Sequence, residues 1–163
     1  MRSLSFNQPR QRSIGMAINN SKVLIGGLAA GVVMNLMDYL GNAVIFAERM
    51  KAESNAFKPG LGDMMSQMDG KSLAGLVIMD FVIGGLLVWT YAAMRPRFGP
   101  GVKTAVYTAL VFWIFGSIIA SGYMQMGMIS SGLWLSFGAF YLVTLLLASV
   151  VGAWLYKEDS ATS

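Results

Sequence analysis

The chain has 163 residues, of which 55% are hydrophobic and 12% are charged, whereas an ordinary soluble domain has roughly 25% charged residues. This composition excludes a soluble globular domain. The absence of cysteine and histidine excludes thiol nucleophiles, disulfides and the usual zinc sites. The formal net charge is +4, but the basic residues sit mainly at the ends of apolar blocks and are not interleaved with aromatic residues outside them. We therefore expect no nucleic-acid partner.

The N-terminal segment, residues 1–22, is polar and carries four basic residues and no acidic one. We expect a basic tail that is disordered or lies on the membrane surface. The apolar block that follows is too long for the hydrophobic region of a signal peptide, contains an acidic residue and lacks a convincing small-residue cleavage site. It is therefore predicted to be a retained first span.

Four apolar blocks follow one another along the chain. Each is about 23 to 25 residues long, and a helix needs about 20 residues to cross the hydrocarbon core of a bilayer. The predicted spans are residues 23–47, 72–94, 104–126 and 132–156. The sequence thus predicts an all-α integral membrane four-helix bundle, with a single transmembrane domain over 23–156 and a C-terminal tail over 157–163.

The orientation of the bundle can be predicted from its basic residues, because those near span ends are retained in the cytoplasm. The turn 95–103 has three basic residues and no acidic one, and it must share a side with the basic tail in a four-span protein. The echo of Trp89 and Tyr91 in Trp154 and Tyr156 fits an aromatic belt at that same interface. Both termini are therefore predicted to be cytoplasmic.

The connection between the first two spans is about 25 residues long and contains a candidate short helix. Asp63 is expected to be its N-cap and Gly70 its C-terminal stop. Met64, Met65 and Met68 would then form the apolar face of a short helix at the membrane interface.

Methionine is abundant, with 13 copies, several of which fall at or beyond the predicted outer interface. Thioethers are soft ligands that favour Cu(I), so a soft-metal site is one hypothesis. The alternative, which we favour, is that these side chains form apolar interfacial surface, and we therefore predict no cofactor. The candidate soft-metal ligands are Met65, Met68, Met124, Met126 and Met128.

The first span carries a polar stripe that is costly in a membrane. Asn35, Asp38, Tyr39 and Asn42 follow the spacing i, i+3, i+4, i+7, which places them on one helical face. We expect that face to look into the bundle. An acidic residue deep in a membrane helix costs about 2.5 to 3.5 kcal/mol on insertion scales, so a function is the default hypothesis for Asp38.

The second span carries the other acidic residue, Asp80. Asp38 and Asp80 lie about 12 to 14 Å inside the outer ends of their spans, at about 1.5 Å per residue, so adjacent antiparallel helices would bring them to one level. No lysine or arginine lies within a predicted span. The carboxyls must therefore be protonated, be hydrogen-bonded or bind a cation. The candidate hydroxyl partners are Ser117 and Ser121 of the third span, and Ser136 and Tyr141 of the fourth.

Small residues form a further pattern. Gly27 and Gly31 in the first span, and Gly116 and Ala120 in the third, are spaced four apart. This spacing allows close helix contact in a membrane. Whether the contacts lie within the bundle or between copies is left open.

A resemblance rests on three segments: the run WTYAAMRPRFGPGVKTA over 89–105, the glycine-rich start of the first span, and the ending GAWLY over 152–156. Together they resemble a group of small four-span bacterial membrane proteins of uncharacterised function. The likeness covers the spans but not the basic tail or the methionine-containing connection. It implies a bacterial cytoplasmic membrane and four spans, and it implies no activity.

Two functions remain open from the sequence. The favoured interpretation is a non-enzymatic bundle for packing, partner binding or membrane organisation, with the lipid bilayer, a second copy or another membrane protein as its partners. The alternative is a proton- or cation-coupled carrier that uses Asp38 and Asp80. An enzyme is disfavoured because the interfacial regions lack a histidine, a cysteine or an acidic cluster.

Overall fold

The computed structural model describes residues 18–156, and this part of the chain consists of helices and short connections, with no strand. Four helical segments are long and apolar enough to cross a membrane. They confirm the predicted all-α four-helix bundle. Apart from residues 18–22, the predicted tails lie outside the described residues. The segments are α1 (Asn20–Tyr39) continued by the π-helix η1 (Leu40–Ile45), α4 (Gly70–Phe98), α5 (Val102–Gln125) and α6 (Ser131–Leu155).

The largest boundary difference is at the end of α4, which continues to Phe98 instead of the predicted residue 94. Pro96 lies in the last turn, where it removes one backbone donor without ending the helix. Arg95 and Arg97 lie in the same turn, where positive charge is favourable to the helix dipole. The helix ends at Gly99, whose φ of 83° is one that glycine adopts without strain.

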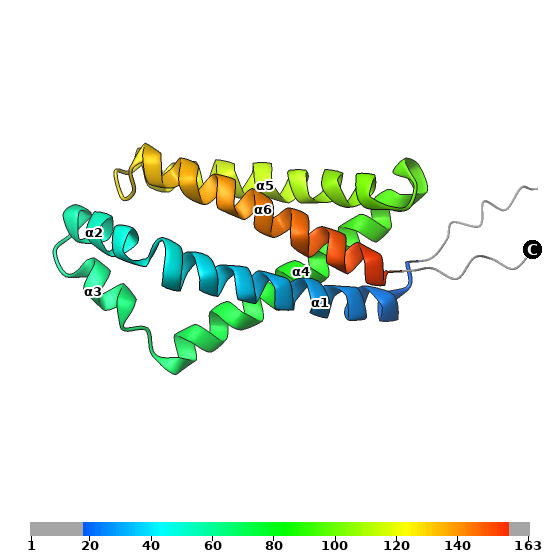
Figure 1. Cartoon of the computed structure of the whole chain (residues 1–163), viewed down its shortest axis with the longest axis horizontal. Helices are drawn as coiled ribbons and strands as arrows, with labels where there is room; N and C mark the ends of the chain where they lie inside the picture. The colour runs from blue at the N-terminus through cyan, green and yellow to red at the C-terminus, as the bar shows by residue number, and fades with distance from the viewer. Residues whose placement is uncertain (1–17, 157–163) are drawn as a thin grey trace, which may run out of the picture.

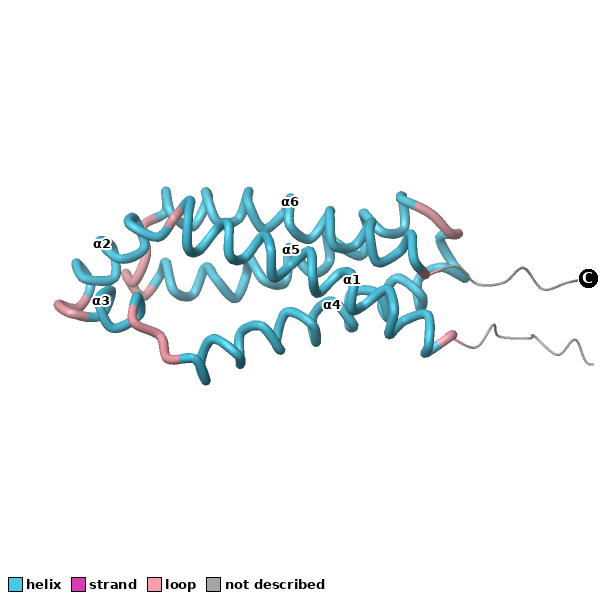
Figure 2. Tube along the Cα trace, turned by 60° about the horizontal axis from the view of Figure 1, so that its bottom comes forward, coloured by secondary structure: helices cyan, strands magenta, loops and turns pink. Residues whose placement is uncertain are grey.

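The helices form a bundle in which α1 packs against α4 and α6, and α5 packs against α6 (Figures 1 and 2). One end of the bundle holds the start of α1, the end of α6 and the α4–α5 turn (Figure 1). The opposite end holds the connection between α1 and α4 and the connection between α5 and α6 (Figure 1). We name these the inner end and the outer end, after the orientation expected from the sequence.

The tightest helix contact is the crossing of α1 and α4, which is made by glycine. A Cβ placed on Gly84 would come 2.6 Å from the Gly31 nitrogen and 2.7 Å from the Gly27 oxygen. A Cβ on Gly27 would come 2.7 Å from the Gly85 Cα. The two backbones therefore touch, and the small-residue pair of the first span packs within the bundle. Gly116, by contrast, has open space where its Cβ would be.

The inner end is closed by two tyrosines. Tyr91 and Tyr156 are both 2% exposed, and their rings meet edge to face with centroids 6.1 Å apart. The Tyr91 hydroxyl accepts a hydrogen bond from the Gly101 N–H at 3.0 Å, and the Tyr156 hydroxyl accepts one from the Asn19 N–H at 3.1 Å. These side chains hold the α4–α5 turn and the start of α1 against the bundle.

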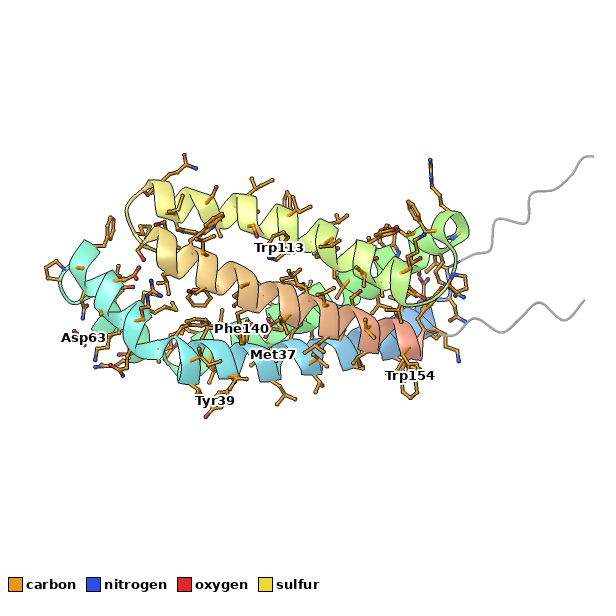
Figure 3. The ribbon with its side chains drawn as sticks, turned by 45° about the horizontal axis from the view of Figure 1, so that its top comes forward. Met37, Tyr39, Asp63, Trp113, Phe140 and Trp154 are labelled. Carbon is orange, nitrogen blue, oxygen red and sulfur yellow. The ribbon has the colours of Figure 1, made fainter. Side chains whose placement is uncertain are left out.

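The predicted aromatic belt needs correction at these positions. Trp89 and Trp154 are exposed, as side chains of a belt must be, and Trp154 points away from the bundle (Figure 3). Tyr91 and Tyr156 are core residues instead, because on a helix a residue two positions further on faces a different side.

At the outer end, the connection between α1 and α4 folds into two short helices, α2 (Ala47–Phe57) and α3 (Leu61–Ser66). Lys51 and Asp63 form an ion pair at 2.9 Å that joins them. Asn55 accepts the Gly62 N–H at 2.7 Å and donates to Asp63 at 3.2 Å. The connection is therefore a folded cap on the bundle.

The predicted caps of the short helix are wrong. Its N-cap is Gly60, with a φ of 84°, and Asp63 lies in the first turn. Gly70 does not stop a helix but begins α4, where the Asp69 carboxylate accepts the Ser72 N–H at 2.9 Å. A sequence reading places such caps poorly because aspartate is favoured both at the N-cap and in the first turn.

The first third of α4 is exposed over its whole length. Every residue from Gly70 to Met79 is exposed. Figures 1 and 2 both show this end of α4 leaning away from α1. The four spans are thus packed together at the inner end, whereas α4 diverges from α1 at the outer end.

Candidate functional site

The first span changes its helical geometry in its outer part. Over Leu40–Ile45 it is a π-helix, and the Phe46 N–H bonds to the Gly41 oxygen at 2.9 Å. Glycine at position 41 lets the Phe140 ring of α6 lie against the helix backbone, because a Cβ there would come 2.7 Å from Cε1 of Phe140. Short π-helical segments are frequent at functional sites, where they re-aim side chains.

The π-helix directs Phe46 onto α6. The Phe46 ring lies 4.5 Å from that of Phe137 and 5.7 Å from that of Phe140, between centroids. Tyr141 continues the cluster, with its centroid 6.0 Å from that of Phe137 and 6.2 Å from that of Phe140. The four rings tie the first span to α6 and fix the position of the Tyr141 hydroxyl.

That hydroxyl lies against the acidic residue of the first span. Tyr141 interacts with the Asp38 carboxyl, and its oxygen accepts a long hydrogen bond of 3.5 Å from the Asn42 amide. The same amide donates to the Asp38 backbone oxygen at 3.0 Å. The Asp38 Oδ1 atom is buried and has no hydrogen-bond partner among the described residues.

Asp80 approaches the same place from α4. Its side chain is 8% exposed and makes no hydrogen bond with any described residue, and it interacts electrostatically with Asp38 and Tyr141. We call Asp38 and Asp80 the carboxyl pair. Away from the helix ends, the four spans carry no lysine or arginine that could neutralise it. Burial and mutual repulsion therefore both oppose two negative charges here.

The remaining predicted residues of the polar stripe have separate positions. The Asn35 amide donates to the Gly31 oxygen at 2.9 Å and, across the helix crossing, to the Val77 oxygen at 3.4 Å. Asn42 is exposed but reaches Tyr141. Tyr39, at 68% exposure, points away from the bundle (Figure 3), so the expectation that the whole stripe looks inward is wrong for it.

The two serines of α5 do not join the carboxyl pair. The Ser121 hydroxyl donates to the Ile118 oxygen of its own helix at 2.7 Å and accepts from Gln125 at 3.5 Å. Ser117 instead lines a groove between α5 and α6.

This groove, which sequence reasoning did not find, has a volume of about 340 Å³. The Trp113 indole crosses from α5 to α6 and donates to the Gly138 oxygen at 2.7 Å (Figure 3). Tyr141 belongs both to the groove wall and to the surroundings of Asp38. The lining of the groove is mostly aromatic and small: Phe112, Trp113, Gly116, Ser117, Ala120, Ile129, Trp134, Phe137, Gly138, Tyr141 and Leu145.

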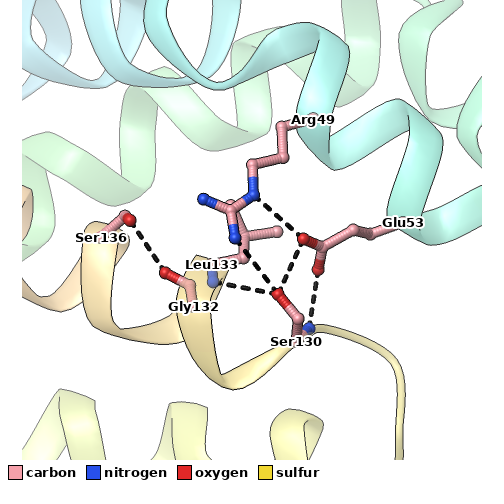
Figure 4. A network of polar contacts seen from close by, with 6 residues as sticks. All are labelled: Arg49, Glu53, Ser130, Gly132, Leu133 and Ser136. Atoms are coloured by element: carbon pink, nitrogen blue, oxygen red, sulfur yellow. Dashed lines mark hydrogen bonds and ion pairs between the residues drawn. The ribbon is translucent and has the colours of Figure 1, made fainter.

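A polar clamp closes the outer end of α6 (Figure 4). The Glu53 carboxylate of α2 accepts the Ser130 N–H at 2.7 Å and its hydroxyl at 2.8 Å, and it pairs with Arg49 at 3.1 Å. The Ser130 hydroxyl also accepts the Leu133 N–H at 3.1 Å, which caps α6. Partial desolvation raises the pKa of Glu53, but hydrogen bonds from Ser130 and Arg49 outweigh it and lower the pKa overall.

The methionines named as soft-metal ligands are spread over the outer end. Met65 lies on α3, Met68 between α3 and α4, Met124 in the last turn of α5, and Met126 and Met128 in the connection to α6. Within residues 18–156, no group of three or more histidine, cysteine or acidic side chains could hold a metal ion. The soft-metal hypothesis stays a prediction.

Comparison of the chain with protein families, with curated proteins and with solved structures gives no match. The four apolar spans make this chain a multi-pass membrane protein. Its role has to be argued from the site itself.

Proposed function

We propose that this protein is a small carrier that binds a proton or a small cation at the carboxyl pair and couples its movement to transport. The observation that carries the proposal is Asp80: its side chain is buried in the bundle and makes no hydrogen bond with a described residue. Two acidic groups from different spans, without a basic partner, need a positive charge from outside the chain.

The packing interpretation accounts less well for this arrangement. A carboxyl kept for packing would hydrogen-bond across helices, which is worth about 0.6 to 2 kcal/mol in a membrane. Asp38 has one such partner in Tyr141, whereas Asp80 has none in the described part of the chain. The carrier interpretation needs these incomplete contacts, because a site whose partners are all internal has no vacant position for a cation.

Partner binding is the second candidate, and the exposed first third of α4 favours it. Residues 70–79 form an apolar helix surface with no covering element in the described chain. A second copy or another membrane protein would be the partner. This role and the carrier role are compatible.

We place the protein in a bacterial cytoplasmic membrane with both termini inside. The basic α4–α5 turn supports the orientation, because Arg95, Arg97 and Lys103 cluster at one end of the spans. The resemblance of residues 89–105 to small bacterial four-span proteins supports the choice of membrane. Single cysteines at Ala56 or Ser130 should react with an impermeant thiol reagent from outside intact cells, and one at Gly99 should not; the opposite pattern would reverse the orientation.

The carrier role is tested by flux into proteoliposomes. We expect the wild type to move protons or sodium ions down an imposed gradient, and Asp38→Asn and Asp80→Asn to lose this movement, because the amide keeps the shape but not the charge. Asp69→Asn is the matched control: it changes a carboxyl at the start of α4 that only caps the helix, and asparagine caps equally well. Absence of flux in the wild type, or unchanged flux in both site variants, would contradict the proposal.

A further inference from the structure

The carboxyl pair and the α5–α6 groove meet at a single side chain. The Tyr141 ring is part of the groove wall, and its hydroxyl interacts with Asp38. A molecule that contacts the Tyr141 ring in the groove would therefore lie one side chain away from a carboxyl that lacks a full set of partners.

The walls of the groove are suited to a particular chemistry. Aromatic faces attract cations at ring distances of about 6 Å or less, and the attraction grows when water is excluded. Phe112, Trp113, Trp134, Phe137 and Tyr141 all line the groove. Its volume of about 340 Å³ falls within the range of about 300 to 1,000 Å³ that is usual for small-molecule sites.

We propose that the groove binds a hydrophobic organic cation. Its charged centre would lie against Tyr141 and the carboxyl pair, and its apolar substituents would lie among the aromatic side chains of α5 and α6. This inference rests on the proposed function, for which it names the substrate class. A lipid acyl chain would fit the walls as well, but it gains nothing from two acidic side chains nearby, so charge complementarity selects the cation.

Coupling follows from the shared site. A cation that arrives next to a protonated carboxyl of the pair is favoured when that carboxyl gives up its proton, so binding should release about one proton. Protons and organic cation would then compete for one place, and the affinity for the cation should rise with pH. The groove would supply the apolar contact for the substituents of the cation, and the carboxyl pair would exchange its proton for the charged centre.

The test uses the full chain in lipid nanodiscs and two probes of equal size and opposite charge, tetraphenylphosphonium and tetraphenylborate. Binding is measured by equilibrium dialysis, with empty nanodiscs to subtract partition into lipid. We expect saturable binding of the phosphonium only, about one proton released per cation bound, and at least about a tenfold loss of affinity in the Asp38→Asn, Asp80→Asn double variant.

The groove is tested by a matched pair of glycine substitutions on α5. Gly116 lines the groove and Gly122 does not, and both have open space where a Cβ would be. Gly116→Leu should therefore fill the cavity and weaken phosphonium binding, whereas Gly122→Leu should leave it unchanged. Equal binding by both variants would overturn the assignment to this groove.

The remaining outcomes separate this inference from the proposed function. Equal binding of both probes, or binding that survives loss of both acids, would show a neutral apolar groove and overturn the organic cation. The infrared absorption of protonated carboxyls tests the pair alone, because it should titrate in the wild type and disappear in the double variant. If that signal is present and no phosphonium binds, the organic cation is wrong and the proton site stands; if the signal is absent as well, both are wrong.

Discussion

The inner and outer halves of this bundle differ in how their helices are held together. In the inner half, glycine backbones touch and buried hydroxyls bond to backbone groups, as the Ser149 hydroxyl does to the Ala105 oxygen at 2.8 Å. The outer half has an aromatic cluster, a groove and two acids with incomplete contacts. Of the largest fully buried side chains, all but Leu133 lie toward the inner end: Tyr156, Leu87, Val88, Thr104, Thr108, Thr144 and Ser149.

Under the proposed carrier role, this difference separates the residues that stabilise the bundle from those that would bind the transported cation. Close helix contact is the main source of stability available in a membrane, because lipid offers no hydrophobic drive for association. A region where that contact is absent must be retained for another reason, and incomplete polar contacts are typical of sites that bind something. The inner half therefore serves as the scaffold on which the outer half is held open.

The largest change in stability is expected at the glycine crossing of α1 and α4, which holds the inner half together. Gly84→Leu would drive α4 away from Gly27 and Gly31 and should lower the free energy of unfolding by about 3 kcal/mol, as overpacking does. Gly75→Leu is the control, because the same helix is exposed there and leucine is the better helix former. Unfolding in mixed micelles with increasing sodium dodecyl sulfate, followed by circular dichroism, measures both. Similar losses in the two variants would mean that the inner crossing is not the scaffold.

A smaller effect of opposite sign is expected in the outer half. Asp80→Leu removes a buried carboxyl that makes no hydrogen bond with a described residue, so it should raise the free energy of unfolding by about 1 kcal/mol while it abolishes flux. Asp38→Leu should instead be destabilising, because it leaves the Tyr141 hydroxyl without its carboxyl. The same unfolding assay compares the two. A clear loss of stability in Asp80→Leu would return that residue to a packing role.

The smallest effect is expected at the clamp. The pKa of Glu53 is lower in the folded chain than its ordinary value of 4.5, so its stabilising contribution is complete above that pH and is lost as the pH falls through the folded pKa. Because the pair with Arg49 is at the surface, we expect a loss of less than about 1 kcal/mol between pH 6 and pH 3. Thermal unfolding of Glu53→Gln should lack this part of the pH dependence. Glu48→Gln, on the same helix, should keep it.

Much of the scaffold could be predicted from the sequence. Span length and apolar composition depend on the thickness of the bilayer, so the four helices follow from counting residues. Matching depths in antiparallel neighbours were enough to expect Asp38 and Asp80 in one neighbourhood, and the two side chains lie within electrostatic range of each other. Glycine spacing indicated close contact in α1, although its partner, the glycine pair of α4, could not be identified from a single helix.

The parts that were missed depend on contacts between helices. The expected inward face of the stripe failed for Tyr39, because the four residues cover a wide arc of the helix and Tyr39, at one edge of that arc, faces outward. The groove arises from how α5 and α6 pack, and the spacing of residues within a single helix does not predict that packing. Tyr141 could be seen near the middle of its span, but its link to Asp38 required knowing which helix lies beside α6.

The π-helix also makes the outer end tolerant of one particular deletion. Each residue of an α-helix turns the chain by about 100°, so removal of one residue from a regular α-helix rotates everything that follows by about that angle. The wider π-helix over Leu40–Ile45 fits about one more residue into the same rotation. Removal of a single residue there would let the span become a regular α-helix and would leave Phe46, together with the α2 helix that carries Glu53, facing nearly the same direction. The first span can thus lose one residue at this position and still keep the aromatic cluster and the clamp.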